Sequence, residues 1–482
     1  MIEEWKEDTL PVNNARDQLW YIRDLILVKM ICIVTDRTSN KNRENHPGDD
    51  GKDNESGYIP QKSDFLDTNI KVSFRRLVKS ISSTTYASHG MYYYPAKFIP
   101  QVVRWAIDRY TSEGSEILDP FAGSGTVCVE ALLTGRNATC IDLSPILNVL
   151  IEGKTFRNPS LEGLLQKASN ITKSAKEYIP KWSNIRYWYP ESIYRILSKM
   201  WGGYFENKDP ILLLALLKTS KKYSFGDDQV PKLFKSKQKI KSIEGILRED
   251  YDAMIHSYFF KTVKEMYSSS IEFSKLYRGG NIRAIGDTDM LNYEPEGRYD
   301  LIVTSPPYGQ AHEYIRSVKL ELGWLGYGDE KIRELGKHEI PYSRNVPSVE
   351  IKSKTFAEYL AKVKSDKIRT ISENYFKSVL SILDKCMKHL NESGHAAIFI
   401  GNASFGGITF PFHKIFKEHM EHEGYTFEIL LEDKIIGRRL FKGRNNLSPN
   451  GMDSEYLLVM GNSKNISKIN VSTEVKPLIY YA

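Results

Sequence analysis

YDLIVTSPPY, residues 299–308, is a short apolar run that ends at two prolines. The apolar half is typical of a strand buried in a parallel sheet. The prolines remove two N–H donors and fix φ, so the backbone must leave the sheet at Ser305. Ligands of open α/β sheets bind at the carboxyl ends of strands, where this turn presents the Ser305 hydroxyl, rigid carbonyl groups and the Tyr308 ring. This set can hold an amino group on a flat base; the alternative is a structural proline turn.

A second strand–turn–helix pattern lies at SEILDPFAGSGTVCVEALL, residues 115–133, and a further strand follows at Ala138–Ile141. The glycine turn lets a ligand approach the backbone closely. Asp142 follows the second strand and can hold ribose hydroxyls, or else cap the next helix. A nicotinamide dehydrogenase remains an alternative, but Cys128 stands where its fingerprint needs a third small residue. The pattern therefore predicts a nucleotide-binding βαβ unit.

The composition is that of a globular chain of several structural units, with 482 residues, 41% hydrophobic and 26% charged. The net charge of +7 permits a polyanionic partner without requiring one. None of the cysteines has a CxxC or CxxH spacing, so we expect no disulfide framework, no zinc site and a reducing, cytoplasmic setting; they are Cys32, Cys128, Cys140 and Cys386. The apolar residues 19–35 are interrupted by charges, so no membrane span is expected.

The order of the patterns predicts an α/β fold with a mixed sheet of about seven strands and a mainly helical insertion. Other expected elements are a helix that can begin at Pro95, an irregular loop at 328–365, a helix at 366–392, and a closing hairpin of Thr426–Leu431 with Ser454–Met460. We divide the chain into an N-terminal helical segment with a polar linker (1–64), a cofactor-binding half (65–154), the insertion (155–280) and a catalytic half (281–482).

The insertion contains a basic stretch, KLFKSKQKIKSIEGILRED, residues 232–250. Such a run is usually a solvated helix face. Its place inside a nucleotide-handling sheet also suggests contact with phosphates.

Taken together, these patterns resemble the amino-methylating DNA methyltransferases, which transfer a methyl group from S-adenosylmethionine to the exocyclic amines of bases. DPFAGSGT resembles their cofactor motif, TSPPY their catalytic motif, YYYPAKFIP the segment before the cofactor motif, and GHAAIFIGN a later strand. The resemblance covers about 89–154 and 281–461, and it implies a Rossmann-like methyltransferase fold with S-adenosylmethionine as cofactor and no metal.

The resemblance also implies site residues. The catalytic turn would be Ser305, Pro306, Pro307 and Tyr308. The cofactor would contact Tyr94, Pro95, Ala96, Lys97, Asp119, Pro120, Phe121, Gly123, Ser124, Gly125, Thr126, Asp142, Leu143 and Asp287. The order of cofactor motif, insertion and catalytic motif makes 155–280 the leading target-recognition region, with 328–365 and 437–447 as rivals.

SPPY is most often found in the cytosine-N4 group of this family, so we expect N4 methylation of cytosine in duplex DNA, as the modification enzyme of a restriction–modification system. Adenine-N6 methylation is the first alternative, and an RNA or protein methyltransferase or a catalytically silent binding module is more distant. C5 methylation is disfavoured because it needs a nucleophilic Cys, which in that family follows a Pro, and no Cys here follows one. The base would be flipped from the helix and stacked on Tyr308.

Overall fold

The computed structural model describes residues 69–227, 232–309, 313–340, 346–435 and 453–462. The chain divides into two units, Met1–Asp64 and Phe65–Ala482, and only the second contains described residues. The expected helical segment and linker at 1–64 and the basic loop at 437–447 lie outside them.

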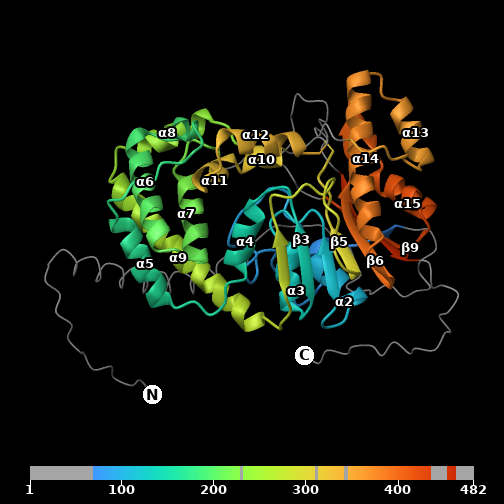
Figure 1. The fold of residues 1–482 in the computed structure, drawn as a ribbon, viewed down its shortest axis with the longest axis horizontal. Coiled ribbons are helices and arrows are strands. Elements are labelled where there is room, and N and C mark those ends of the chain that lie inside the picture. The colour runs from blue at the N-terminus through green and yellow to red at the C-terminus, as the bar shows by residue number, and fades with distance from the viewer. Residues whose placement is uncertain (1–68, 228–231, 310–312, 341–345, 436–452, 463–482) are drawn as a thin grey trace, which may run out of the picture. The chain divides into compact units, whose positions relative to one another are not determined.

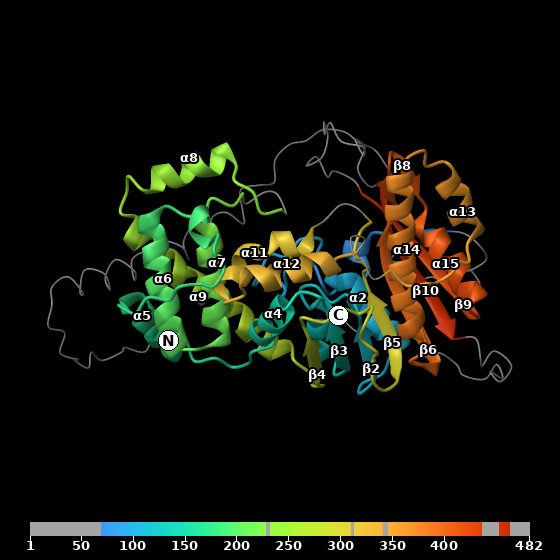
Figure 2. The same ribbon diagram turned by 45° about the horizontal axis from the view of Figure 1, so that its top comes forward.

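An eight-stranded mixed sheet forms the centre of the described chain, in the order β1-β9-β10-β6-β5-β2-β3-β4. Figure 2 shows β4, β3, β2, β5 and β6 side by side. These five strands pair in parallel, and β10 runs antiparallel to both β6 and β9. The strands are β1 (Ile70–Lys71), β2 (Glu116–Asp119), β3 (Asn137–Ile141), β4 (Ile282–Ile285), β5 (Tyr299–Thr304), β6 (Leu390–Gly401), β9 (Tyr425–Lys434) and β10 (Ser454–Asn462).

Helices cover both faces of this sheet (Figure 1). Leu301 and Val303 of β5 pack into the core shared with α2 and α3, whereas Ile302 packs into the core shared with α14 and α15. This alternation is what a strand buried on both faces requires. The helices around the sheet are α2 (Pro100–Tyr110), α3 (Thr126–Leu133), α4 (Ile146–Lys154), α13 (Lys354–Ala361), α14 (Asp366–Met387) and α15 (Phe412–His422), with the 3-10 turn η2 (Phe74–Arg76).

The insertion is helical, as expected, and its helices pack around an apolar core that also includes Tyr94 and Ile146. Trp201 stacks on Trp324 there, with ring centroids 5.5 Å apart, so α11 belongs to the same core. Figure 1 shows these helices gathered beside α4. They are α5 (Leu161–Lys173), η3 (Ile185–Trp188), α6 (Glu191–Glu206), α7 (Pro210–Lys222), α8 (Lys237–Ile246) and α9 (Tyr251–Leu276), joined by α10 (Tyr314–Ser317), α11 (Lys319–Trp324) and α12 (Asp329–His338).

The expected α/β fold and its closing hairpin are confirmed, and several element boundaries differ. The helix after Pro95 begins at Pro100, the N1 position that proline favours. The region 328–365 is not an irregular loop, because it contains α12 and α13. The expected helix at 366–392 ends at Met387, since Leu390 already pairs with β5.

One further element of the described chain had no counterpart in the sequence analysis. A small hairpin, β7 (Ala403–Phe405) with β8 (Ile408–Phe410), follows β6. Among the described residues, no helix combines the length and apolarity needed to cross a bilayer.

Candidate active site

A pocket opens at the carboxyl ends of β2, β3 and β5, and its empty volume is about 970 Å³ with the open space at its mouth included. This is the edge at which an open α/β sheet binds its ligands. The lining comes from segments far apart in the chain: 94–98, 119–124, 142–144, 288–290, 305–308, 314–315, 338–340 and Ile382. The structure thus brings the expected catalytic turn and most of the expected cofactor contacts to one cavity.

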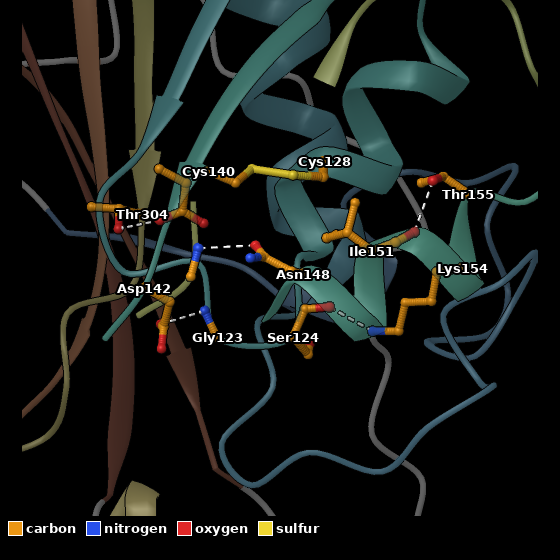
Figure 3. Close-up of a disulfide and its surroundings, with 12 residues drawn as sticks. Gly123, Ser124, Cys128, Cys140, Asp142, Asn148, Ile151, Lys154, Thr155 and Thr304 are labelled. Carbon is orange, nitrogen blue, oxygen red and sulfur yellow. Dashed lines mark hydrogen bonds between the residues drawn. A yellow bond between two sulfur atoms is a disulfide. The ribbon is translucent and has the colours of Figure 1, made fainter. Parts of the chain in front are cut away.

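The glycine loop between β2 and α3 is tied to the residue after β3. The Gly123 N–H donates to Asp142 Oδ2 at 2.7 Å (Figure 3). The Ser144 N–H donates to Asp142 Oδ1 at 2.8 Å. Gly125 adopts φ +73°, and a Cβ there would lie 1.9 Å from Ile151 Cδ1. Only glycine suits this position, because both the backbone conformation and the packing exclude a side chain.

The Asp119 side chain connects β2 to β5. Its Oδ1 accepts hydrogen bonds from the Thr304 hydroxyl at 2.6 Å and from the Phe121 N–H at 3.1 Å. The side chain is 2% exposed, and burial raises the pKa of Asp119 from its ordinary 3.8 to about 7. The carboxyl group thus sits at the junction of β2 and β5, on the floor of the pocket.

The segment before α2 forms the wall of the pocket opposite the sheet. The Tyr94 ring lies over the glycine loop, since a Cβ on Gly123 would be 3.3 Å from Tyr94 Cε1. Ala96 holds the left-handed φ of +51°, a strained conformation of a kind that concentrates at functional sites. Lys97 lines the pocket, and its Nζ donates to the His89 carbonyl at 2.6 Å.

The SPPY turn is held from behind by α14 and by the β7–β8 hairpin. The Tyr375 hydroxyl donates to the Pro307 carbonyl at 2.8 Å. Gly309 follows the turn, and a Cβ there would lie 2.4 Å from Phe405 Cζ. Sequence reasoning missed both Tyr375 and Thr304. Tyr375 looks like one more apolar position of an amphipathic helix, and Thr304 like one more strand residue.

Two acidic groups complete the lining, Glu339 from the segment after α12 and Asp289 from the segment after β4, and both were missed. Glu339 Oε1 accepts the Ile315 N–H at 2.8 Å, and burial raises the pKa of Glu339 from 4.5 to about 7. Asp289 Oδ2 lies 2.9 Å from His338 Nδ1. No local signal marked Glu339, because the sequence of 328–365 is typical of a polar loop.

Three of the expected cofactor residues do not line the pocket. Gly125 and Thr126 lie behind the loop, at the start of α3. Asp287 has φ +59° and pairs with Lys331 at 2.8 Å, while its neighbour Asp289 reaches the cavity. The assignment of Asp287 to the cofactor stays a prediction.

A disulfide between Cys128 and Cys140 joins α3 to β3 (Figure 3). The expectation of no disulfide was therefore wrong for this pair. The cysteine spacing gave no sign of it, because α3 packs back on β3 and brings the two Cα atoms within 6.5 Å. Among the described residues, no cluster of His, Cys, Asp or Glu could hold a metal ion.

Comparison with known proteins gives a consistent picture. A family model described as DNA methylase, covering N6 and N4 methyltransferases, matches residues 8–149. The Type II methyltransferase M.BsoBI of Geobacillus stearothermophilus is 25% identical over 55% of this chain and 58% of its own length. The Type II methyltransferase M.AvaI of Nostoc is 22% identical over 74% of this chain and 83% of its own length. The chain thus spans little more than half of the M.BsoBI relative.

Among solved structures, a TehB-like SAM-dependent methyltransferase of Corynebacterium glutamicum aligns over 75% of this chain and 86% of its own length. The two are 11% identical, with a TM-score of 0.22. The pocket itself fits S-adenosylmethionine, the cofactor of this family. Gly123 has no side chain, so a ligand can approach the backbone of the glycine loop beside the Tyr94 ring, where a Cβ would crowd it. Asp142 offers an acceptor for ribose hydroxyls, and Lys97 offers a cation. The pocket and the relatives agree: the chain is similar to the amino-methylating, N6/N4 DNA methyltransferases, and its pocket fits S-adenosylmethionine, the cofactor of such enzymes.

Proposed function

We propose that the chain transfers a methyl group from S-adenosylmethionine to the exocyclic N4 of cytosine in duplex DNA. The observation that carries the proposal is that the SPPY turn (305–308) and residues 121–124 of the glycine loop line one pocket. The cofactor supplies an already activated methyl group, so the protein contributes mainly by positioning the two reactants.

The turn offers acceptors for an amino group. The Pro307 carbonyl already accepts the Tyr375 hydroxyl, which leaves the Pro306 carbonyl and the Ser305 hydroxyl as the acceptors we assign to the target amine. Two such bonds would orient the nitrogen lone pair toward the methyl group. The Tyr308 ring would stack on the flipped base.

The choice of cytosine rests on Ser305, in place of the Asp or Asn of related turns. Adenine N6 is the alternative target within the same enzyme class. We further propose that the reaction takes place in the cytoplasm, on the duplex DNA of the cell. The partner that we propose is a restriction endonuclease of the same specificity, which acts as a separate protein.

The insertion is the part of the chain that we propose reads DNA. Two of its lysines already have partners within the chain and are less suited to contact DNA phosphates. Lys235 Nζ lies 3.4 Å from the centroid of the Tyr187 ring, and buried Lys239 donates to the Lys222 carbonyl at 2.9 Å. The exposed lysines Lys237 and Lys241 remain for phosphates, one turn apart on α8.

The primary experiment is methylation of mixed-sequence duplex DNA with isotopically labelled cofactor, followed by digestion and mass spectrometry of the nucleosides. We expect labelled N4-methylcytosine. Labelled N6-methyladenine would overturn the base assignment and retain the enzyme class. Label only in an RNA control, or in no nucleoside, would refute DNA methylation.

Two variants test the assigned roles. Ser305→Ala should lower kcat by about 10- to 100-fold, the loss of one hydrogen bond to a group that develops charge, with cofactor affinity retained. The pair Lys237→Gln and Lys241→Gln should reduce the slope of log affinity for DNA against log salt by about 2. An unchanged slope would remove this face of α8 from the DNA interface.

A further inference from the structure

The segment that leads from β1 to the end of α2 is basic and contains no acidic residue before Asp108. Within residues 69–107 there are six lysines and arginines and no Asp or Glu; the six are Lys71, Arg75, Arg76, Lys79, Lys97 and Arg104. The whole chain has a net charge of +7, so this stretch has an excess of positive charge almost as large as that of the whole chain. Such clustering indicates a polyanionic partner more strongly than the total charge does.

Three of these cations are exposed and have no partner within the described chain. Arg75 and Arg76 lie in η2, and Lys79 follows three residues later. In the ranges that the structure describes, none of the three side chains makes a hydrogen bond or an ion pair. Their charges are therefore available to a ligand from outside the chain.

The backbone that presents these side chains is anchored on both sides. Phe74 is 0% exposed, and its ring packs on that of Phe399 of β6, with centroids 5.3 Å apart. The Phe74 N–H donates to Asp433 Oδ2 at 2.7 Å, so this nearby carboxylate is already engaged. Farther along, the Ile81 carbonyl accepts a hydrogen bond from Gln101 Nε2 of α2 at 3.3 Å. The basic residues between the two anchors are thus held in an ordered segment.

This segment lies at the same edge of the sheet as the pocket. β1 is parallel to β9, and β9 and β6 are both antiparallel to β10, so β1 runs in the same direction as β6 and β5. Residues 72–80 therefore follow the carboxyl end of β1. β1 and β9 lie on the β6 side of β5, whereas the insertion returns into β4 at the opposite end of the sheet. The insertion and the basic segment lie on opposite sides of the pocket.

The spacing of the strands gives the distance from the catalytic turn. Neighbouring strands are about 4.8 Å apart, so β9 and β1, three and four strands from β5, lie about 14 to 19 Å from it. Successive phosphates of one DNA strand are about 3.4 Å apart along the helix axis. A duplex that lies along this edge with its target at β5 therefore reaches the basic segment about 4 to 6 base pairs away.

We propose that Arg75, Arg76 and Lys79 bind the phosphates of duplex DNA on the side of the pocket opposite the insertion. The choice of duplex DNA as the polyanion rests on the proposed function. Contacts to phosphates fix the position of a duplex and carry no sequence information. With α8 on one side of the pocket and this segment on the other, the duplex is held on both sides while the target base leaves the helix.

The test measures binding of mixed-sequence duplex DNA to the intact chain by fluorescence anisotropy at a series of salt concentrations. The triple variant Arg75→Gln, Arg76→Gln and Lys79→Gln should lower the slope of log affinity against log salt by about 2 to 3, because each phosphate contact contributes about 0.9. Each single substitution should lower it by about 0.9, which keeps the test decisive if the triple variant folds poorly. Calorimetric affinity for S-adenosylhomocysteine should not change, because none of the three residues lines the pocket.

The matched control is the triple variant Arg109→Gln, Arg278→Gln and Lys388→Gln. It removes the same charge from three exposed residues that precede β2, β4 and β6, at the opposite edge of the sheet. At physiological salt the field of an exposed charge is screened within about 8 Å, so the slope of this control should equal that of the unaltered chain.

Equal slopes for the basic-segment variant and the control would overturn the phosphate contact. If the unaltered chain still methylates duplex DNA, the proposed function survives that result. If the unaltered chain binds RNA and neither binds nor methylates duplex DNA, the proposed contact and the proposed function both fail.

Discussion

Replacing Asp119 by Asn should remove a loss of stability that the unaltered chain suffers as pH rises. Burial raises the pKa of Asp119 from 3.8 to about 7 in the folded chain. Between these values the folded chain keeps a proton on Asp119 that the unfolded chain has released. The free energy of unfolding therefore falls as pH rises through this window and levels off above about pH 7. The gap between 3.8 and about 7 corresponds to about 4 kcal/mol over the whole window.

The assay is urea unfolding of the cofactor-free chain at a series of pH values from about 5 to 8. Most of the loss falls inside this range, so Asp119 should account for about 3 kcal/mol of the decline. Asn has no proton to lose, and the Asp119→Asn curve should be flatter by that amount. Glu339→Gln should flatten the curve in the same window, because burial also raises the pKa of Glu339 to about 7.

Asp366→Asn is the control for removing one carboxyl group, since Asp366 is exposed in the first turn of α14. Its curve should run parallel to that of the unaltered chain. If the Asp119→Asn curve is also parallel to that of the unaltered chain, the pKa of Asp119 is not raised by its burial between β2 and β5, and the reasoning is refuted.

Two further predictions concern the turns that shape the pocket. Gly125→Ala should destabilise the chain by about 2 kcal/mol or more and weaken cofactor binding, because its Cβ would clash with Ile151 and the residue would hold a left-handed φ. Urea unfolding and calorimetry measure the two effects. The control is Gly245→Ala on α8, which should be neutral or stabilising, because a Cβ there meets nothing within 4 Å. Tyr375→Phe leaves the Pro307 carbonyl without its donor, so kcat should fall about 10-fold while the Kd of the cofactor stays the same, and a loss of cofactor affinity would refute a role confined to the catalytic turn.

The glycine turn and the SPPY turn could be predicted because each is written in consecutive residues. A left-handed φ at Gly125 and two adjacent prolines act on the local backbone alone. Their meeting in space could also be anticipated, since both follow parallel strands and the carboxyl ends of such strands share one edge. These local signals were therefore enough to predict the two turns that line the floor of the pocket.

The remaining parts of the site depend on contacts between distant residues. The Thr304–Asp119 bond crosses two strands, and Tyr375 reaches Pro307 from a helix that follows it in the chain. Glu339 reaches the pocket only because α10 and α12 bring residues 314–340 over it. No spacing in the sequence records such side-chain meetings. The Cys128–Cys140 bond was missed for the same reason.

The insertion can be large without disturbing the chemistry because the sheet holds both of its ends. It leaves after α4, whose Lys154 is tied to the glycine loop, and it returns as β4, which pairs in parallel with β3. Exposed residues of α8 can therefore change without moving the pocket. Its interior is different, because Tyr94 of the pocket wall packs in the same apolar core as α6 and α7. If the insertion reads DNA, as we propose, recognition can vary on its surface, whereas substitutions in its core affect the cofactor pocket.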